Sequence, residues 1–128
     1  MLEILIGLFM VLHGLVHGLY FGQSARLFEL RPSMVWPDGS WAFSQLLGNK
    51  ATRFLAAVSC LLADIGFVAG GIGMLLKWSL WRPVVIVTSI FSSLIFILFW
   101  DGKLNKPNDK GGLAILINAA ILTALFVF

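Results

Sequence analysis

Residues 4–21 read ILIGLFMVLHGLVHGLYF, an apolar stretch interrupted by His13 and His17. A membrane-spanning helix needs roughly 20 mostly apolar residues, and about 17 at the short end. Three further segments qualify, at about residues 54–76, 83–100 and 113–128. Backbone groups in lipid must be hydrogen-bonded internally, and these segments lack the alternation of barrel strands, so helices are expected. The sequence therefore predicts an all-α integral membrane protein, an up-down four-helix bundle forming a single transmembrane domain over residues 1–128.

The composition excludes other classes of protein. Hydrophobic residues make up 59% of the chain and charged residues 12%, and the mean hydropathy is +0.96. A typical soluble domain is about 45–50% apolar and about 25% charged. Intrinsic disorder needs low hydrophobicity, and a disulfide scaffold needs more than the single Cys60. The basic residues form no stripe, so we expect no nucleic-acid partner.

The distribution of positive charge predicts the orientation in the cell membrane. Only Met1, Leu2 and Glu3 precede the first segment, and no small-x-small cleavage site is present, so we expect a retained span rather than a signal peptide. The first and third loops carry most of the basic residues, namely Arg26, Arg31, Lys50, Arg53, Lys103, Lys106 and Lys110. Lys77 and Arg82 lie on the opposite side. The positive-inside rule then places both long loops in the cytoplasm and both termini outside.

The segment after the first span, about residues 33–48, carries Trp36, Trp41 and Phe43 with few charges. Such aromatic residues favour the headgroup level of a bilayer. We expect an interfacial segment, with a short helix at about residues 40–47 lying on the membrane. The alternative interpretation is a lid over one mouth of the bundle.

Six polar side chains at membrane depth are the candidate site residues: His13, His17, Asp64, Ser92, Ser93 and Asn118. Polar groups inside a membrane are costly, so each needs a partner or a cavity. His13 and His17 share one helical face because they are four residues apart. Depths counted at about 1.5 Å per residue predict one layer of His13, Asp64 and Ser92 or Ser93, with a hydrogen bond between His13 and Asp64. They predict a second layer of His17 with Asn118.

Three interpretations of these layers stay open. A hydrogen-bonded pair between helices can fix which faces meet. A polar centre can also hold the head of a lipid-phase ligand such as a quinone, a sterol-like compound or a fatty acid. Thirdly, Asp64 and His13 could handle protons, since histidine titrates near neutral pH. We expect no cofactor and no metal, because His13-x3-His17 lacks the metalloprotease glutamate. A catalytic triad of Ser92, His13 and Asp64 is supported only by the residue types, because the sequence shows no geometry.

Small residues repeat along the second span, with Gly66, Gly70 and Gly73 on one stripe. Such stripes let helix backbones approach closely. They predict either packing between the first and second spans of the same chain or a homodimer through this stripe.

Two short stretches resemble uncharacterised small four-span bacterial membrane proteins of the broad DoxX-like kind. They are residues 12–18, LHGLVHG, and residues 99–103, FWDGK, followed by Gly112 and Asn118. The resemblance implies a four-helix membrane architecture and no assigned reaction. In size and span number the chain is also similar to small multidrug transporters, which carry a glutamate in their first span where this chain has histidines.

The expected function is that of a small, non-catalytic membrane protein in contact with membrane lipids. It would bind a lipid-phase small molecule within its bundle or act as an accessory subunit of a larger membrane complex. The alternative is a dimeric, proton-coupled small transporter that uses Asp64 and His13.

Overall fold

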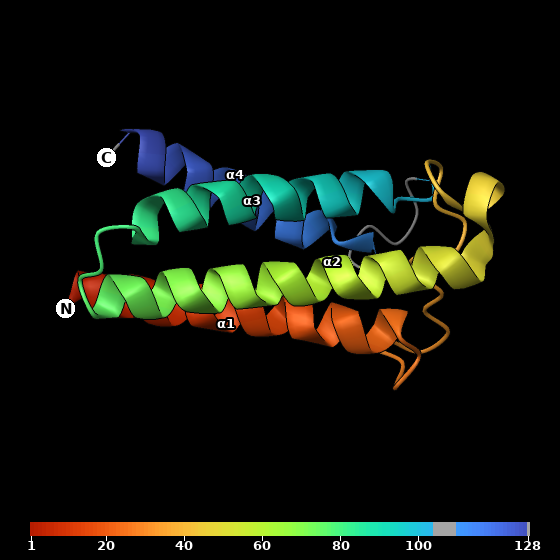
Figure 1. Ribbon diagram of the computed structural model, residues 1–128, viewed down its shortest axis with the longest axis horizontal. Helices are drawn as coiled ribbons and strands as arrows, with labels where there is room; N and C mark the ends of the chain where they lie inside the picture. Colours follow the sequence, from red (N-terminus) through yellow and green to blue (C-terminus); the bar gives the residue numbers. More distant parts are fainter. Residues whose placement is uncertain (104–109, 128) are drawn as a thin grey trace.

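The computed structural model describes residues 1–103 and 110–127 and contains four helices in an up-down arrangement (Figure 1). They are α1 (Leu2–Ser24), α2 (Ser44–Leu75), α3 (Trp81–Leu98) and α4 (Gly112–Val127). The predicted all-α, four-helix, up-down architecture is confirmed. The stretch 104–109, with Lys106 and a predicted Lys-Pro-Asn-Asp turn, lies outside the described residues, as does Phe128.

Three of the helices, α1 to α3, are long and apolar enough to cross a membrane, and α4 is a shorter apolar helix. By the length and composition of these helices, the chain is a multi-pass membrane protein. The loops after α1 and α3 lie at one end of the bundle, and both termini lie at the other (Figure 1). This arrangement puts the described basic residues near these two loops, Arg26, Arg31, Lys50, Arg53, Lys103 and Lys110, at one end, and Lys77 and Arg82 at the other. Which end faces the cytoplasm stays a prediction.

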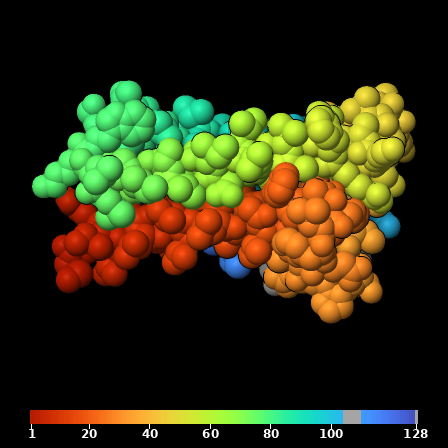
Figure 2. Space-filling model, turned by 60° about the horizontal axis from the view of Figure 1, so that its bottom comes forward, coloured from red at the N-terminus to blue at the C-terminus, as the bar shows by residue number. Residues whose placement is uncertain are grey.

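Glycines allow α1 and α2 to pack side by side along their length (Figure 2). A methyl group added at Gly71 of α2 would lie 2.7 Å from the backbone oxygen of Gly7 on α1. One added at Gly14 of α1 would lie 3.0 Å from the backbone oxygen of Asp64 on α2. Because backbone atoms cannot rotate away, no larger side chain fits at these crossings without separating the helices.

The glycine stripe at positions 66, 70 and 73 faces α3 of the same chain. A methyl group at Gly66 would collide with Thr88, and one at Gly70 with Val85. The stripe thus packs within the bundle, but against α3 rather than against the first span as expected, and other glycines, Gly7, Gly14 and Gly71, form the contact between α1 and α2. The homodimer through this stripe stays a prediction, because the structure holds a single chain.

The segment between α1 and α2 folds over the loop end of the bundle. Trp36 is 4% exposed and packs against Tyr20 and Phe96 inside the bundle. The Oγ of Ser40 donates a hydrogen bond to the carbonyl of Leu98, and the indole N–H of Trp41 donates one to the carbonyl of Ile97. These contacts tie the segment to the end of α3.

The expected interfacial helix at residues 40–47 is only partly formed. Helix begins at Ser44 and bends at Gly48, which has a φ of 81°. Trp36 is buried among aromatic side chains of α1 and α3 at the loop end of the bundle. The place of this segment at the membrane interface stays a prediction.

Candidate functional site

Four polar side chains from three helices meet in the middle of the bundle. They are His13 and His17 of α1, Ser92 of α3 and Asn118 of α4, each at most 3% exposed. His13 Nε2 lies 2.9 Å from Asn118 Oδ1, and Asn118 Nδ2 lies 2.8 Å from Ser92 Oγ. Ser92 Oγ lies 2.5 Å from His17 Nε2, and His17 Nδ1 lies 2.9 Å from the backbone oxygen of His13. The four side chains and one carbonyl therefore form a closed hydrogen-bonded ring, which we call the polar ring.

The donor and acceptor of each hydrogen bond in the polar ring can be assigned by starting from the backbone carbonyl of His13. The carbonyl of His13 can only accept, so His17 carries its proton on Nδ1 and its Nε2 accepts from the Ser92 hydroxyl. Ser92 in turn accepts from the Asn118 amide. The Asn118 oxygen accepts from Nε2–H of His13. Each imidazole then holds one proton, so the whole polar ring is neutral.

If the Asn118 amide had the opposite orientation, with its oxygen and nitrogen exchanged, the polar ring would carry a positive charge. Ser92 would have to donate to Asn118, and His17 would have to donate from Nε2 to Ser92 while it still donates from Nδ1 to the His13 carbonyl. That state is an imidazolium cation, which no acidic side chain among residues 1–103 and 110–127 contacts, at membrane depth, where a charge costs several kcal/mol. The neutral orientation is therefore the one that the fold stabilises.

Aromatic side chains enclose both imidazoles. The ring of Phe67, on α2 and fully buried, lies 4.6 Å from that of His13 and 5.1 Å from that of His17. Phe96 of α3 lies 5.7 Å from His17, and Phe9 stacks on His13 at 6.2 Å. Sequence reasoning missed these residues as part of the site. Their positions three or four residues from polar ones, as in Phe9 before His13 and Phe96 after Ser92, were the available signal.

The predicted pairing of His13 with Asp64 is wrong. In the described part of the chain, no hydrogen bond joins them, and His13 bonds to Asn118 instead. Asp64 lies at the outer seam of α1 and α2, where a methyl group added at Gly18 would be 2.8 Å from its Oδ2. The predicted second layer of His17 with Asn118 is wrong as well, because Asn118 bonds to His13 and His17 bonds to Ser92. The two predicted layers are one ring without Asp64, so counting residues along the helices gave neither the correct partners of the histidines nor the face of α2 that meets α1.

Ser92 and Ser93, which the sequence left undivided, have different environments. Ser92 is fully buried and belongs to the polar ring, whereas the hydroxyl of Ser93 donates to the carbonyl of Ser89 in its own helix at 2.9 Å. Ser93 therefore lies outside the site.

A groove with two cavities lies between α1 and α4. The consecutive helices pack closely, whereas α1 and α4 do not. One cavity, of about 520 Å³, lies toward the termini and has walls that include Phe9, Ala120 and Ala124. The other, of about 410 Å³, lies toward the loops and is lined by His13, Val16 and Leu19 among others. Ile117 lines both, so the hydrogen bond between His13 and Asn118 crosses the groove at its waist.

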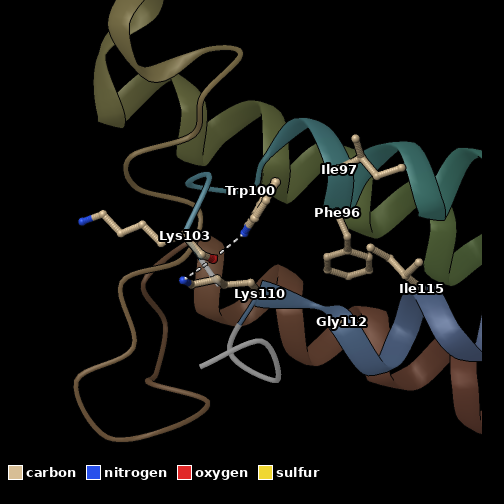
Figure 3. A pocket seen from close by; sticks show the side chains of 7 residues that line it. All are labelled: Phe96, Ile97, Trp100, Lys103, Lys110, Gly112 and Ile115. Atoms are coloured by element: carbon tan, nitrogen blue, oxygen red, sulfur yellow. Dashed lines mark hydrogen bonds between the residues drawn. The ribbon is translucent and has the colours of Figure 1, made fainter. Parts of the chain in front are cut away.

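A smaller cavity of about 330 Å³ lies between α3 and α4 at the loop end (Figure 3). At the loop end of its lining, the carbonyl of Lys103 accepts a hydrogen bond from the Trp100 indole at 2.8 Å and one from Lys110 Nζ at 3.1 Å. Lys110 also forms an ion pair with Asp101 at 3.0 Å. These contacts place a tryptophan and lysines at one end of α3 and α4, where interface anchors are expected.

The chemistry available at the polar ring is limited by its closure. Ser92 and His17 form a hydroxyl–imidazole contact, but both are fully buried and each is engaged within the ring. Over residues 1–103 and 110–127, no group of three or more His, Cys, Asp or Glu lies in a position to hold a metal ion. The groups of the polar ring are thus engaged with one another, and the groove beside it is the space open to another molecule.

No protein-family model, curated protein or solved structure matches the chain. What the structure supports of the resemblance noted above is the four-helix architecture alone.

Proposed function

We propose that this small multi-pass membrane protein binds a lipid-phase small molecule in the groove between α1 and α4. The observation that carries the proposal is the groove itself, whose walls on both sides of a polar waist are mostly apolar, with Arg82 in one cavity and Tyr20 and Arg31 in the other. Binding sites for small molecules are concave and mostly apolar, with a few placed polar groups. This groove has that composition.

The packing of the other helices supports this assignment. Glycines bring α1 onto α2 and α2 onto α3, so close backbone packing fills those two interfaces. Between α1 and α4, the bridge from His13 to Asn118 holds the helices in place. A bundle needing only stability would close this side with apolar contacts, which in lipid provide most of the packing energy.

Native mass spectrometry of the protein extracted gently from its own membrane tests the proposal. We expect a retained non-phospholipid mass, one per chain. Ala120 lines the groove, so Ala120→Leu should fill the cavity and abolish retention. Ala119→Leu is the matched control on the same helix, at an exposed position outside the cavity lining, and should retain the mass. Absence of the mass from the unaltered protein, or equal loss in both variants, would contradict the proposal.

A second candidate function, an accessory subunit of a larger membrane complex, is favoured by Asp64. Its side chain is partly exposed on the outer seam of α1 and α2, and the described residues give it no hydrogen bond. A partner helix that brings a hydrogen-bond donor would relieve the cost of this carboxyl in lipid. Co-purification of a second membrane protein that is lost in Asp64→Leu would support it. Transport through a joint action of Asp64 and His13 is not favoured, because the polar ring excludes Asp64.

A further inference from the structure

The two histidines of α1 differ in how many of their ring nitrogens are engaged. His17 uses both: Nδ1 donates to the His13 carbonyl and Nε2 accepts from Ser92. His13 uses one, because Nε2 donates to the Asn118 oxygen. In a neutral imidazole the other nitrogen is an acceptor, so Nδ1 of His13 presents a lone pair. Within residues 1–103 and 110–127, no side chain or backbone group donates to it.

The side chain of His13 borders the groove between α1 and α4. The residue lines the loop-side cavity of the groove, next to Val16 and Ile117. Tyr20 and Arg31 line the same cavity nearer the loops and already take part in other interactions. The buried polar side-chain atoms that lack a partner among the described residues are elsewhere, at Trp36 Nε1, Ser44 Oγ and Ser89 Oγ. Because His13 lines the cavity and its Nε2 is engaged with Asn118, its Nδ1 is the candidate acceptor for a molecule bound there.

We infer that the molecule bound in the groove carries a hydroxyl group that donates a hydrogen bond to Nδ1 of His13. This inference rests on the proposed function and names the chemical class of the ligand. A long-chain alcohol, a sterol and a phenol share that chemistry. A quinone or an ether would place its own lone pairs against that of the imidazole. A cationic head would lose its hydration in a cavity that is already lined by the cationic side chain of Arg31, at a high cost.

The polar ring makes the selection directional. A free histidine could exchange its tautomers and accept from or donate to a ligand equally well. Here Asn118 holds the proton of His13 on Nε2, and its orientation is in turn fixed by Ser92 and His17. The hydrogen bond from Nε2–H to Asn118 therefore leaves Nδ1 of His13 as an acceptor. Asn118 and Ser92 act as positioning residues for this recognition.

The test uses two photoactivatable probes that differ in one hydrogen-bond donor. Hexadecanol with a mid-chain diazirine and its O-methyl ether are each added to the full chain in phosphatidylcholine vesicles, and labelled residues are mapped by mass spectrometry. We expect the alcohol to label α1 and α4 residues of the groove at least about tenfold more than the ether. Excess unlabelled hexadecanol should compete, and hexadecyl methyl ether should not.

Variants assign the selectivity to His13. His13→Phe should remove the preference for the alcohol, because phenylalanine keeps the aromatic contacts and lacks the acceptor. Leu12→Phe changes the adjacent, lipid-exposed position and should leave the preference intact. Should His13→Phe fail to fold, the ratio measured on the unaltered chain still decides the matter.

The outcomes separate the two proposals. Equal labelling of the groove by both probes would overturn the hydroxyl inference and leave the binding groove standing. A preference that survives in His13→Phe would also overturn it. No labelling of the groove by either probe would overturn the proposed function.

Discussion

The neighbouring serines of α3 give the sharpest test of the polar ring, because they share a chemical group and a helix. Ser92→Ala removes a hydroxyl that donates to His17 and accepts from Asn118, whereas Ser93→Ala removes one that bonds to its own helix. Hydrogen bonds between membrane helices are worth about 0.6 kcal/mol on average and up to about 1.7. Two lost bonds therefore predict a cost of about 1–3 kcal/mol for Ser92→Ala. We expect Ser93→Ala to stay within about 0.5 kcal/mol of the unaltered protein.

The free energy of unfolding in mixed micelles, titrated with a denaturing detergent, measures this difference. A further variant, Asn118→Leu, removes the same bond to Ser92 and the bond to His13. It should cost about as much as Ser92→Ala, and the double variant should cost less than the sum, because the two residues share one hydrogen bond. Equal costs for the two serine variants would refute the polar ring as an element of stability. Strict additivity of Ser92→Ala and Asn118→Leu would refute their contact.

Two other substitutions test the helix packing. Gly71→Ala places a methyl group 2.7 Å from the backbone oxygen of Gly7, so α1 and α2 must separate, at a cost of about 1–3 kcal/mol in the same detergent titration. The control Ala69→Leu changes a lipid-exposed position of the same helix and should leave the free energy of unfolding unchanged. An unchanged free energy of unfolding in Gly71→Ala would show that the helices do not cross here. Asp64→Leu should leave the isolated chain as stable as before or more stable, because no hydrogen bond is lost within the described residues and a costly carboxyl leaves the lipid. A clear loss of stability in Asp64→Leu would mean that the chain itself partners this carboxyl.

The helices were predictable from the sequence because lipid imposes a simple rule. Apolar segments of sufficient length, separated by prolines, glycines and charges, leave few alternatives to helical spans. The up-down order and the shared end of the two long loops follow from four consecutive spans. The faces of individual helices were also visible, since His13 and His17 lie four residues apart.

The pairing of those faces was not predictable, for a geometric reason. Successive residues of a helix are about 100° apart in direction, so depth alone cannot tell which of several polar groups faces a neighbour. Asp64 and Asn118 are equally suited by residue type to form a hydrogen bond with His13. The glycines that place Asp64 at the outer seam of α1 and α2 act through backbone contacts, which the sequence pattern does not reveal. The contacts of Trp36 with Tyr20 and Phe96 were not predictable for a related reason: a tryptophan suits an interface and a buried site alike.

The measurement that tests the central claim most directly is the tautomeric state of the two histidines. The chain holds only two, so selective ¹⁵N labelling of histidine gives a spectrum with two imidazoles and no others. At neutral pH in bilayers, the polar ring predicts two neutral rings, one with its proton on Nε2 (His13) and the other with its proton on Nδ1 (His17). An imidazolium cation, or the same tautomer at both positions, would contradict the account.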